Sequence, residues 1–160
     1  MKKELKILML EDSSTDAELI RRFLLKEYTD CRIQLAITRN EFLYTLENFR
    51  PDLILADNSL PQFDATEALR IVRERGILIP FIMVSGTTKE EYAVQIIKAG
   101  ADDYILKDRL TRLPAAIESA FRHRDAEAEK HRVQQALEQS EEKYRTIVDR
   151  VSDGFMLLDR

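Results

Sequence analysis

The chain of 160 residues is poor in the features that define several large protein classes. Cys31 is its only cysteine, which excludes an internal disulfide and a cysteine metal cluster and favours a reducing, cytoplasmic location. No apolar run reaches membrane length, and the basic N-terminal residues do not precede a signal-peptide core. No basic run or aromatic–basic pattern favours nucleic acid, and no glycine-rich loop favours ATP binding. We therefore expect a segment without membrane or nucleic-acid contacts.

The first two-thirds of the chain alternates short apolar runs with amphipathic stretches of helical period. A threonine or aspartate followed three residues later by glutamate predicts four helix starts, at Thr15, Thr38, Asp64 and Thr88. Five such β–α repeats predict an α/β fold, with a parallel sheet covered by helices on both faces. The five expected strands are Leu5–Leu10, Arg32–Ile37, Leu53–Ala56, Phe81–Val84 and Tyr104–Leu106.

Reactive side chains directly follow four of these runs: Glu11 with Asp12, Asp57, Ser85 and Lys107. In doubly wound sheets, ligands bind beyond the carboxyl ends of the strands, where the strand order reverses. For a flavodoxin-like sheet of order 2-1-3-4-5, that point lies between strands one and three. These are the strands that end at the three acids, so we expect the acids to meet there.

The chemistry of these residues suits phosphoryl transfer. Asp57 is a candidate nucleophile, because a carboxylate can attack phosphorus and form an acyl phosphate. Glu11, Asp12 and Asp57 offer the oxygen ligands that Mg²⁺ prefers, and Lys107 would neutralise phosphoryl charge. Ser85 could donate its hydroxyl to a phosphoryl oxygen, and Thr87 could line the entrance. Each residue alone is more often a cap or a surface residue, so the prediction depends on their meeting in space.

The segment after Pro114 has a different character. It contains neither glycine nor proline from Ala115 to Asp153, and charged residues of both signs are intermixed, which predicts one long exposed helix. Apolar residues recur on it in steps of four and three, the coiled-coil spacing, with one polar member. This stripe favours a parallel homodimer over a solitary charged helix; its members are Val133, Leu137, Ser140, Tyr144, Ile147 and Val151.

The final ten residues, from Val151, read as a turn followed by a new apolar strand. A strand without partners is not a finished domain. We therefore expect the chain to end inside a second domain.

Five motifs occur together in the first part of the chain: Ile7–Asp12, Pro51–Asp57, Leu60-Pro61, Val84–Gly86 and Ala99–Lys107. With these motifs, residues 1–122 resemble the receiver domain of two-component response regulators. The resemblance implies that Asp57 accepts a phosphoryl group from a histidine on a sensor kinase or a phosphotransfer domain. It implies Mg²⁺ bound by Glu11, Asp12, Asp57 and the backbone carbonyl of Ser59.

The same resemblance implies further roles. Ser85 and Tyr104 would form a coupled switch, although Tyr104 reads equally well as a half-buried strand aromatic. Ser59 and Thr87 match positions that tune self-dephosphorylation. The chain departs from the family pattern at Glu11, where aspartate is commoner, and at Asp108, where proline after a cis bond is frequent.

The tail implies a larger protein. Residues 123–145 would be a helical linker with a possible coiled coil, and residues 146–160 are similar to the start of a PAS sensory domain. Together they resemble the front of a hybrid sensor histidine kinase or another multidomain regulator. Two rival functions remain open: a receiver-like interaction module that is never phosphorylated, and a phosphohydrolase that works through an aspartyl phosphate. A phosphohydrolase of this kind would use a second acid at position 59 to protonate the leaving group, but residue 59 is serine.

Overall fold

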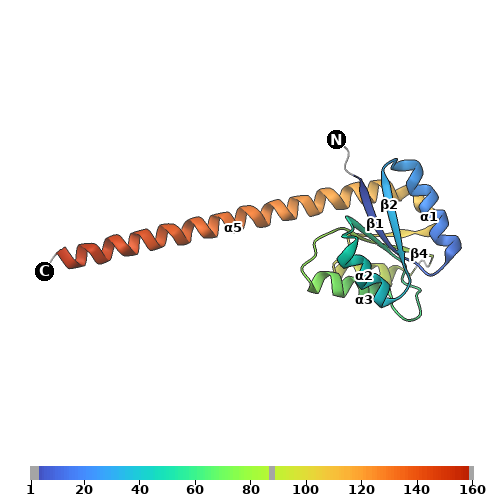
Figure 1. Ribbon diagram of the computed structural model, residues 1–160, viewed down its shortest axis with the longest axis horizontal. Helices are drawn as coiled ribbons and strands as arrows, with labels where there is room; N and C mark the ends of the chain where they lie inside the picture. The colour runs from blue at the N-terminus through green and yellow to red at the C-terminus, as the bar shows by residue number, and fades with distance from the viewer. Residues whose placement is uncertain (1–3, 87–88, 159–160) are drawn as a thin grey trace. The chain divides into compact units, whose positions relative to one another are not determined.

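The computed structural model describes residues 4–86 and 89–158, and for residues 152–158 it describes the backbone alone. The chain divides into two compact units, Met1–Arg124 and Asp125–Arg160. The first unit contains one parallel sheet of order β2-β1-β3-β4-β5, which confirms the predicted topology (Figure 1). The strands are β1 (Leu5–Leu10), β2 (Cys31–Ala36), β3 (Leu53–Ala56), β4 (Phe81–Ser85) and β5 (Asp103–Leu106).

Five α-helices follow the strands in turn, as predicted. A short 3-10 helix, Lys107–Arg112, leads from β5 into the last of them. The α-helices are α1 (Ser14–Glu27), α2 (Arg39–Asn48), α3 (Ala65–Glu74), α4 (Glu90–Lys98) and α5 (Leu113–Leu158).

Side-chain caps fix two of the predicted helix starts and correct a third. Thr38 accepts a hydrogen bond from the Glu41 amide, and Asp64 accepts one from the Glu67 amide, as their spacing predicted. The prediction of Thr15 as a cap was wrong, because the Ser13 hydroxyl caps α1 two residues earlier. Thr88 lies outside the described residues, and α4 begins after Lys89.

Two layers of apolar side chains hold the sheet between its helices. Successive strand residues point to opposite faces, and the two buried clusters follow that alternation. On one face, Leu8 and Ile54 pack with residues of α2, α3 and α4. On the other, Ile7 and Leu53 pack with α1 and with the first turns of α5, residues 113–120. With both faces covered, only the ends of the strands remain for polar chemistry.

The second unit is the continuation of α5. Its apolar stripe is exposed, with Val133 at 59% and Leu137 at 51% of full exposure. The turn and strand predicted from Val151 onward were wrong, because α5 continues to Leu158. An unpaired strand would leave its backbone groups without hydrogen bonds, whereas a helix satisfies them internally. No helix in the described parts of the chain is both long and apolar enough to cross a membrane.

Candidate functional site

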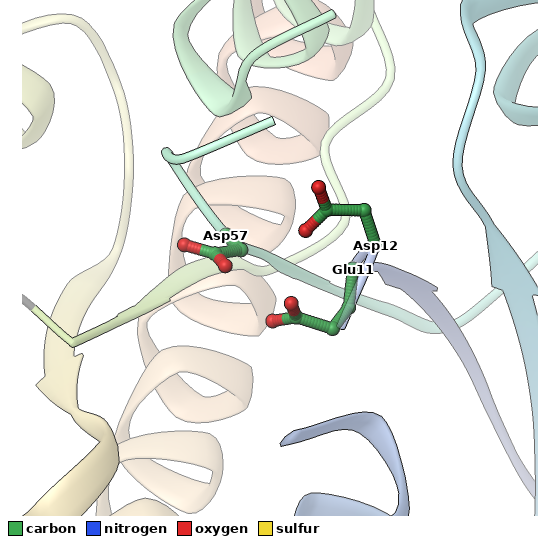
Figure 2. Close-up of side chains that lie close together, drawn as sticks. All are labelled: Glu11, Asp12 and Asp57. Atoms are coloured by element: carbon green, nitrogen blue, oxygen red, sulfur yellow. The ribbon is translucent and has the colours of Figure 1, made fainter. Parts of the chain in front are cut away.

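The three acids lie where two neighbouring strands end. β1 and β3 pair in parallel with Leu10 opposite Ala56, so the residues that follow them leave the sheet side by side. The Asp57 amide extends this ladder by donating to the Leu10 carbonyl oxygen at 2.9 Å. Figure 2 shows the carboxylates of Glu11, Asp12 and Asp57 around one shared space, with an oxygen of each within 4.8 Å of the others.

Lys107 enters this cluster from the end of β5. Its Nζ lies 2.8 Å from Glu11 Oε2 and 2.8 Å from Asp57 Oδ2. A third carboxylate, from Asp16 in the first turn of α1, approaches the same Nζ at 2.7 Å. The side chains of Glu11 and Asp57 are only 2% exposed, and that of Lys107 is 14% exposed. All three donors of the ammonium therefore have a carboxylate partner within hydrogen-bond distance.

The environment shifts the three central pKa values in different directions. Burial raises the pKa of Glu11 to about 7, although hydrogen bonds from Lys107 and the Ser13 amide oppose the shift. Burial also opposes ionisation of Asp57, but hydrogen bonds from Lys107 and Ser59 outweigh it and hold the Asp57 pKa below its usual value. For Lys107, burial is outweighed by the three carboxylates, and its pKa is raised. At neutral pH, Asp57 is therefore an ionised nucleophile beside a charged ammonium.

The acidic cluster fits a magnesium ion. Mg²⁺ binds oxygen at about 2.0–2.1 Å, so two oxygens on one ion lie no more than about 4.2 Å apart. The observed spread of 4.8 Å is close enough for small side-chain rotations to complete the set. Asp12 is exposed, which leaves room for the water ligands that Mg²⁺ retains.

Comparison with known proteins identifies the architecture around this site. Residues 7–118 match the family described as the response regulator receiver domain. The chain belongs to this family. Receivers of this kind act in two-component signalling, and they generally bind Mg²⁺ at an acidic site.

Two curated relatives illustrate the match. The receiver is 28% identical over 129 residues to the response regulator MprA of Mycobacterium avium, covering 78% of this chain and 56% of that protein. It is 30% identical over 120 residues to the probable C4-dicarboxylate response regulator DctR of Bacillus subtilis, covering 73% and 52%. The chain thus spans about half the length of the curated relatives it matches.

Solved structures agree on the fold. A CheY-like receiver domain protein from Methanospirillum hungatei is 26% identical, with a TM-score of 0.62 over 76% of this chain and 99% of that one. The receiver domain of the Francisella response regulator 1452 is 24% identical, with a TM-score of 0.64 over 74% and 98%. The latter likeness supports the fold alone.

Of the remaining predicted residues of this receiver, Ser59 and Ser85 lie at the same edge, and Tyr104 lies within β5. The Ser59 amide and hydroxyl donate to the Asp57 carboxylate at 3.2 and 2.8 Å, so Ser59 contacts the candidate nucleophile directly. Ser85 is fully buried at the end of β4. Tyr104 is half-buried on β5 and packs against the cluster beneath α3 and α4. Thr87 lies outside the described residues, and the bond from Lys107 to Asp108 is trans.

Sequence reasoning missed two polar residues of this receiver. Asp16 contacts Lys107, and its position followed from an available signal, because it stands three residues after the true cap Ser13. Asn58 accepts a hydrogen bond from Ser85, a contact that depends on the pairing of β3 with β4 and has no local sequence signature.

Proposed function

We propose that Asp57 is the phosphoacceptor of this receiver and takes its phosphoryl group from a phosphohistidine. The donor would be a sensor histidine kinase or a histidine phosphotransfer domain, the partners with which receivers of this family interact. One observation carries the proposal: Asp57 directly follows the buried strand β3, and its ionised carboxylate lies 2.8 Å from the ammonium of Lys107. A buried acid that is kept charged beside a cation is suited to nucleophilic attack on an anion.

The transfer requires no further reactant. An oxygen of Asp57 attacks phosphorus, an O–P bond forms, and the P–N bond to the donor imidazole breaks, with the electron pair leaving on that nitrogen. Lys107 would exchange its bond to Asp57 for one to a phosphoryl oxygen, offsetting the added charge. Glu11, Asp12, Asp57 and the Ser59 carbonyl would hold Mg²⁺, which when bound neutralises charge on the phosphoryl oxygens.

The state of Asp57 would be read out through Ser85 and Tyr104. Ser85 is the last residue of β4, and Tyr104 lies on the neighbouring strand β5, which pairs with β4 so that Tyr104 is opposite Met83. Rearrangement of this pair would alter the surface around β5 and α5. Ser59, which touches Asp57, and Thr87 would set the lifetime of the acyl phosphate.

Beyond the receiver, we propose that residues 123–145 link it to a sensory PAS module that begins near residue 146. The parent protein would be a hybrid sensor histidine kinase or a related multidomain regulator. Homodimerisation through the stripe on α5 is supported by its exposure, since Tyr144 is 71% and Ile147 59% exposed. Pairing of two such helices would bury this apolar surface.

Intact-mass spectrometry tests the central proposal. The protein is incubated with a small-molecule phosphodonor, with and without Mg²⁺, beside the variant Asp57→Asn. We expect one added phosphoryl group on the wild type only when Mg²⁺ is present, and none on the variant. No adduct, together with no Mg²⁺ binding in titration, would favour a phosphorylation-independent interaction module. Continuous turnover of a generic phosphate ester would instead favour a phosphohydrolase.

A further inference from the structure

The pairing of β3 with β4 places Ser85 beside Asn58. Ala56 lies opposite Met83 at the end of the ladder between these strands. Continuing that register by two residues puts Asn58 opposite Ser85, one position beyond Asp57. The side chain that faces Ser85 across the strands is therefore an amide and not the candidate nucleophile.

A hydrogen bond joins the two side chains. The Ser85 hydroxyl donates to Oδ1 of Asn58 at 2.8 Å. An amide oxygen can only accept, so in this contact the Ser85 hydroxyl is the donor and uses its single O–H hydrogen. Ser85 is completely buried, so bulk water cannot replace this acceptor, whereas Asn58 is partly exposed and can exchange its partner for water.

This bond competes with the function assigned to Ser85. A hydroxyl that donates to Asn58 cannot at the same time donate to a phosphoryl oxygen on Asp57. The bond must break before Ser85 can bind the phosphoryl group, and it therefore stabilises the unphosphorylated arrangement relative to the phosphorylated one.

We propose that Asn58 is a positioning residue that retains the Ser85 hydroxyl in the unphosphorylated receiver and releases it only when a phosphoryl group forms on Asp57. The inference rests on the proposed function and deepens it, because it names the interaction that sets the threshold of the switch. A neutral hydrogen bond of ordinary net strength corresponds to about a two- to tenfold change in an equilibrium constant. Loss of the Asn58 acceptor should shift the switch by that factor towards the phosphoryl-bound state.

Beryllofluoride, a stable mimic of the phosphoryl group, is the probe. Its affinity in the presence of Mg²⁺ is measured by fluorescence or calorimetric titration for the wild type, Asn58→Ala, Ser85→Ala and the double variant. Asn48→Ala is the matched control, since this asparagine is exposed on α2 and its amide donates to the Tyr44 carbonyl oxygen. Thermal unfolding of each variant verifies that it is folded.

We expect Asn58→Ala to bind beryllofluoride about two- to tenfold more tightly than the wild type, with Asn48→Ala unchanged. In the Ser85→Ala background, the Asn58 substitution should have no effect, because the hydroxyl that it releases is gone. Unchanged or weaker binding by Asn58→Ala overturns the inference, and so does equal tightening with and without Ser85. If the wild type itself fails to bind the probe, the proposed function fails first and the inference with it.

Discussion

Replacement of Lys107 by methionine tests the electrostatic balance of the site. The substitution keeps the length and the apolar stem of the side chain and removes the ammonium. Glu11 and Asp57, both 2% exposed, would lose the cation that lies 2.8 Å from each of them. Removing one partner of a buried ion pair costs about 3–5 kcal/mol. Glu11 can relieve part of this cost by taking up a proton, since its pKa is already about 7.

The stability lost on replacing Lys107 should therefore depend on pH, and the direction of that dependence can be worked out. In the wild type, the lowered Asp57 pKa contributes stability that is present above the unfolded pKa and is lost as the pH falls. Without the ammonium, burial dominates, and both carboxyl pKa values lie above their unfolded values. The folded variant then binds more protons than the unfolded chain, and its stability falls as the pH rises. We expect the free energy of unfolding of Lys107→Met to be about 3 kcal/mol lower than that of the wild type at pH 8, and this difference to shrink towards pH 5.

Urea unfolding without divalent cations, at both pH values, measures this deficit. Lys98→Met is the control, because Lys98 is an exposed lysine in the last turn of α4. A Lys107→Met variant as stable as the control at pH 8, or one whose deficit grows as the pH falls, would falsify the electrostatic account of the site.

Three further predictions concern the metal, the fourth acid and the linker helix. Metal binding requires ionised carboxylates, and the pKa of Glu11 is about 7, so the Mg²⁺ affinity should fall as the pH drops from 8 to 6. Calorimetry in buffers of different ionisation enthalpy should detect the protons released on binding. An Mg²⁺ affinity that does not change with pH would contradict this prediction. Asp16→Asn removes a partly exposed carboxylate that competes with Asp57 and the phosphoryl group for the Lys107 ammonium. Phosphorylation followed by mass spectrometry over time should therefore be up to about fivefold faster in this variant. Slower phosphorylation would show that Asp16 assists the transfer. Leu137→Glu should convert a dimer into a monomer in analytical ultracentrifugation, and a wild type that is monomeric at every concentration would refute the coiled coil.

Much of the receiver could be predicted from its sequence, because buried strands and helix faces are visible as apolar patterns in the sequence. Strands buried on both faces read as continuous apolar runs, and Leu53–Ala56 was predicted to the residue. The strand order 2-1-3-4-5 was taken from the flavodoxin-like fold that repeated β–α units favour, and the sheet has this order. The meeting of Glu11, Asp57 and Lys107 followed in turn, since each stands directly after such a run.

Of the two contacts that sequence reasoning missed, that of Asp16 depends on the choice of a local helix cap and that of Asn58 depends on strand register. Asp16 required the correct choice between two possible caps, Ser13 and Thr15, which differ little in intrinsic preference. Asn58 required the register of two strands that are separated by a whole helix. Beyond Val151, the apolar residues are compatible with either a strand or a helix. In the structure α5 continues to Leu158, so the backbone N–H and C=O groups there form hydrogen bonds within the helix.

The position of the phosphoryl group is the measurement that tests the account most directly. An acyl phosphate is reduced by borohydride to an alcohol, so a phosphorylated aspartate becomes homoserine and can be located by peptide sequencing in a mass spectrometer. We predict homoserine at position 57 and at no other acidic residue. Homoserine at position 12 or 16, or a phosphoryl group that is stable to this treatment, would contradict the assignment of Asp57 as the acceptor.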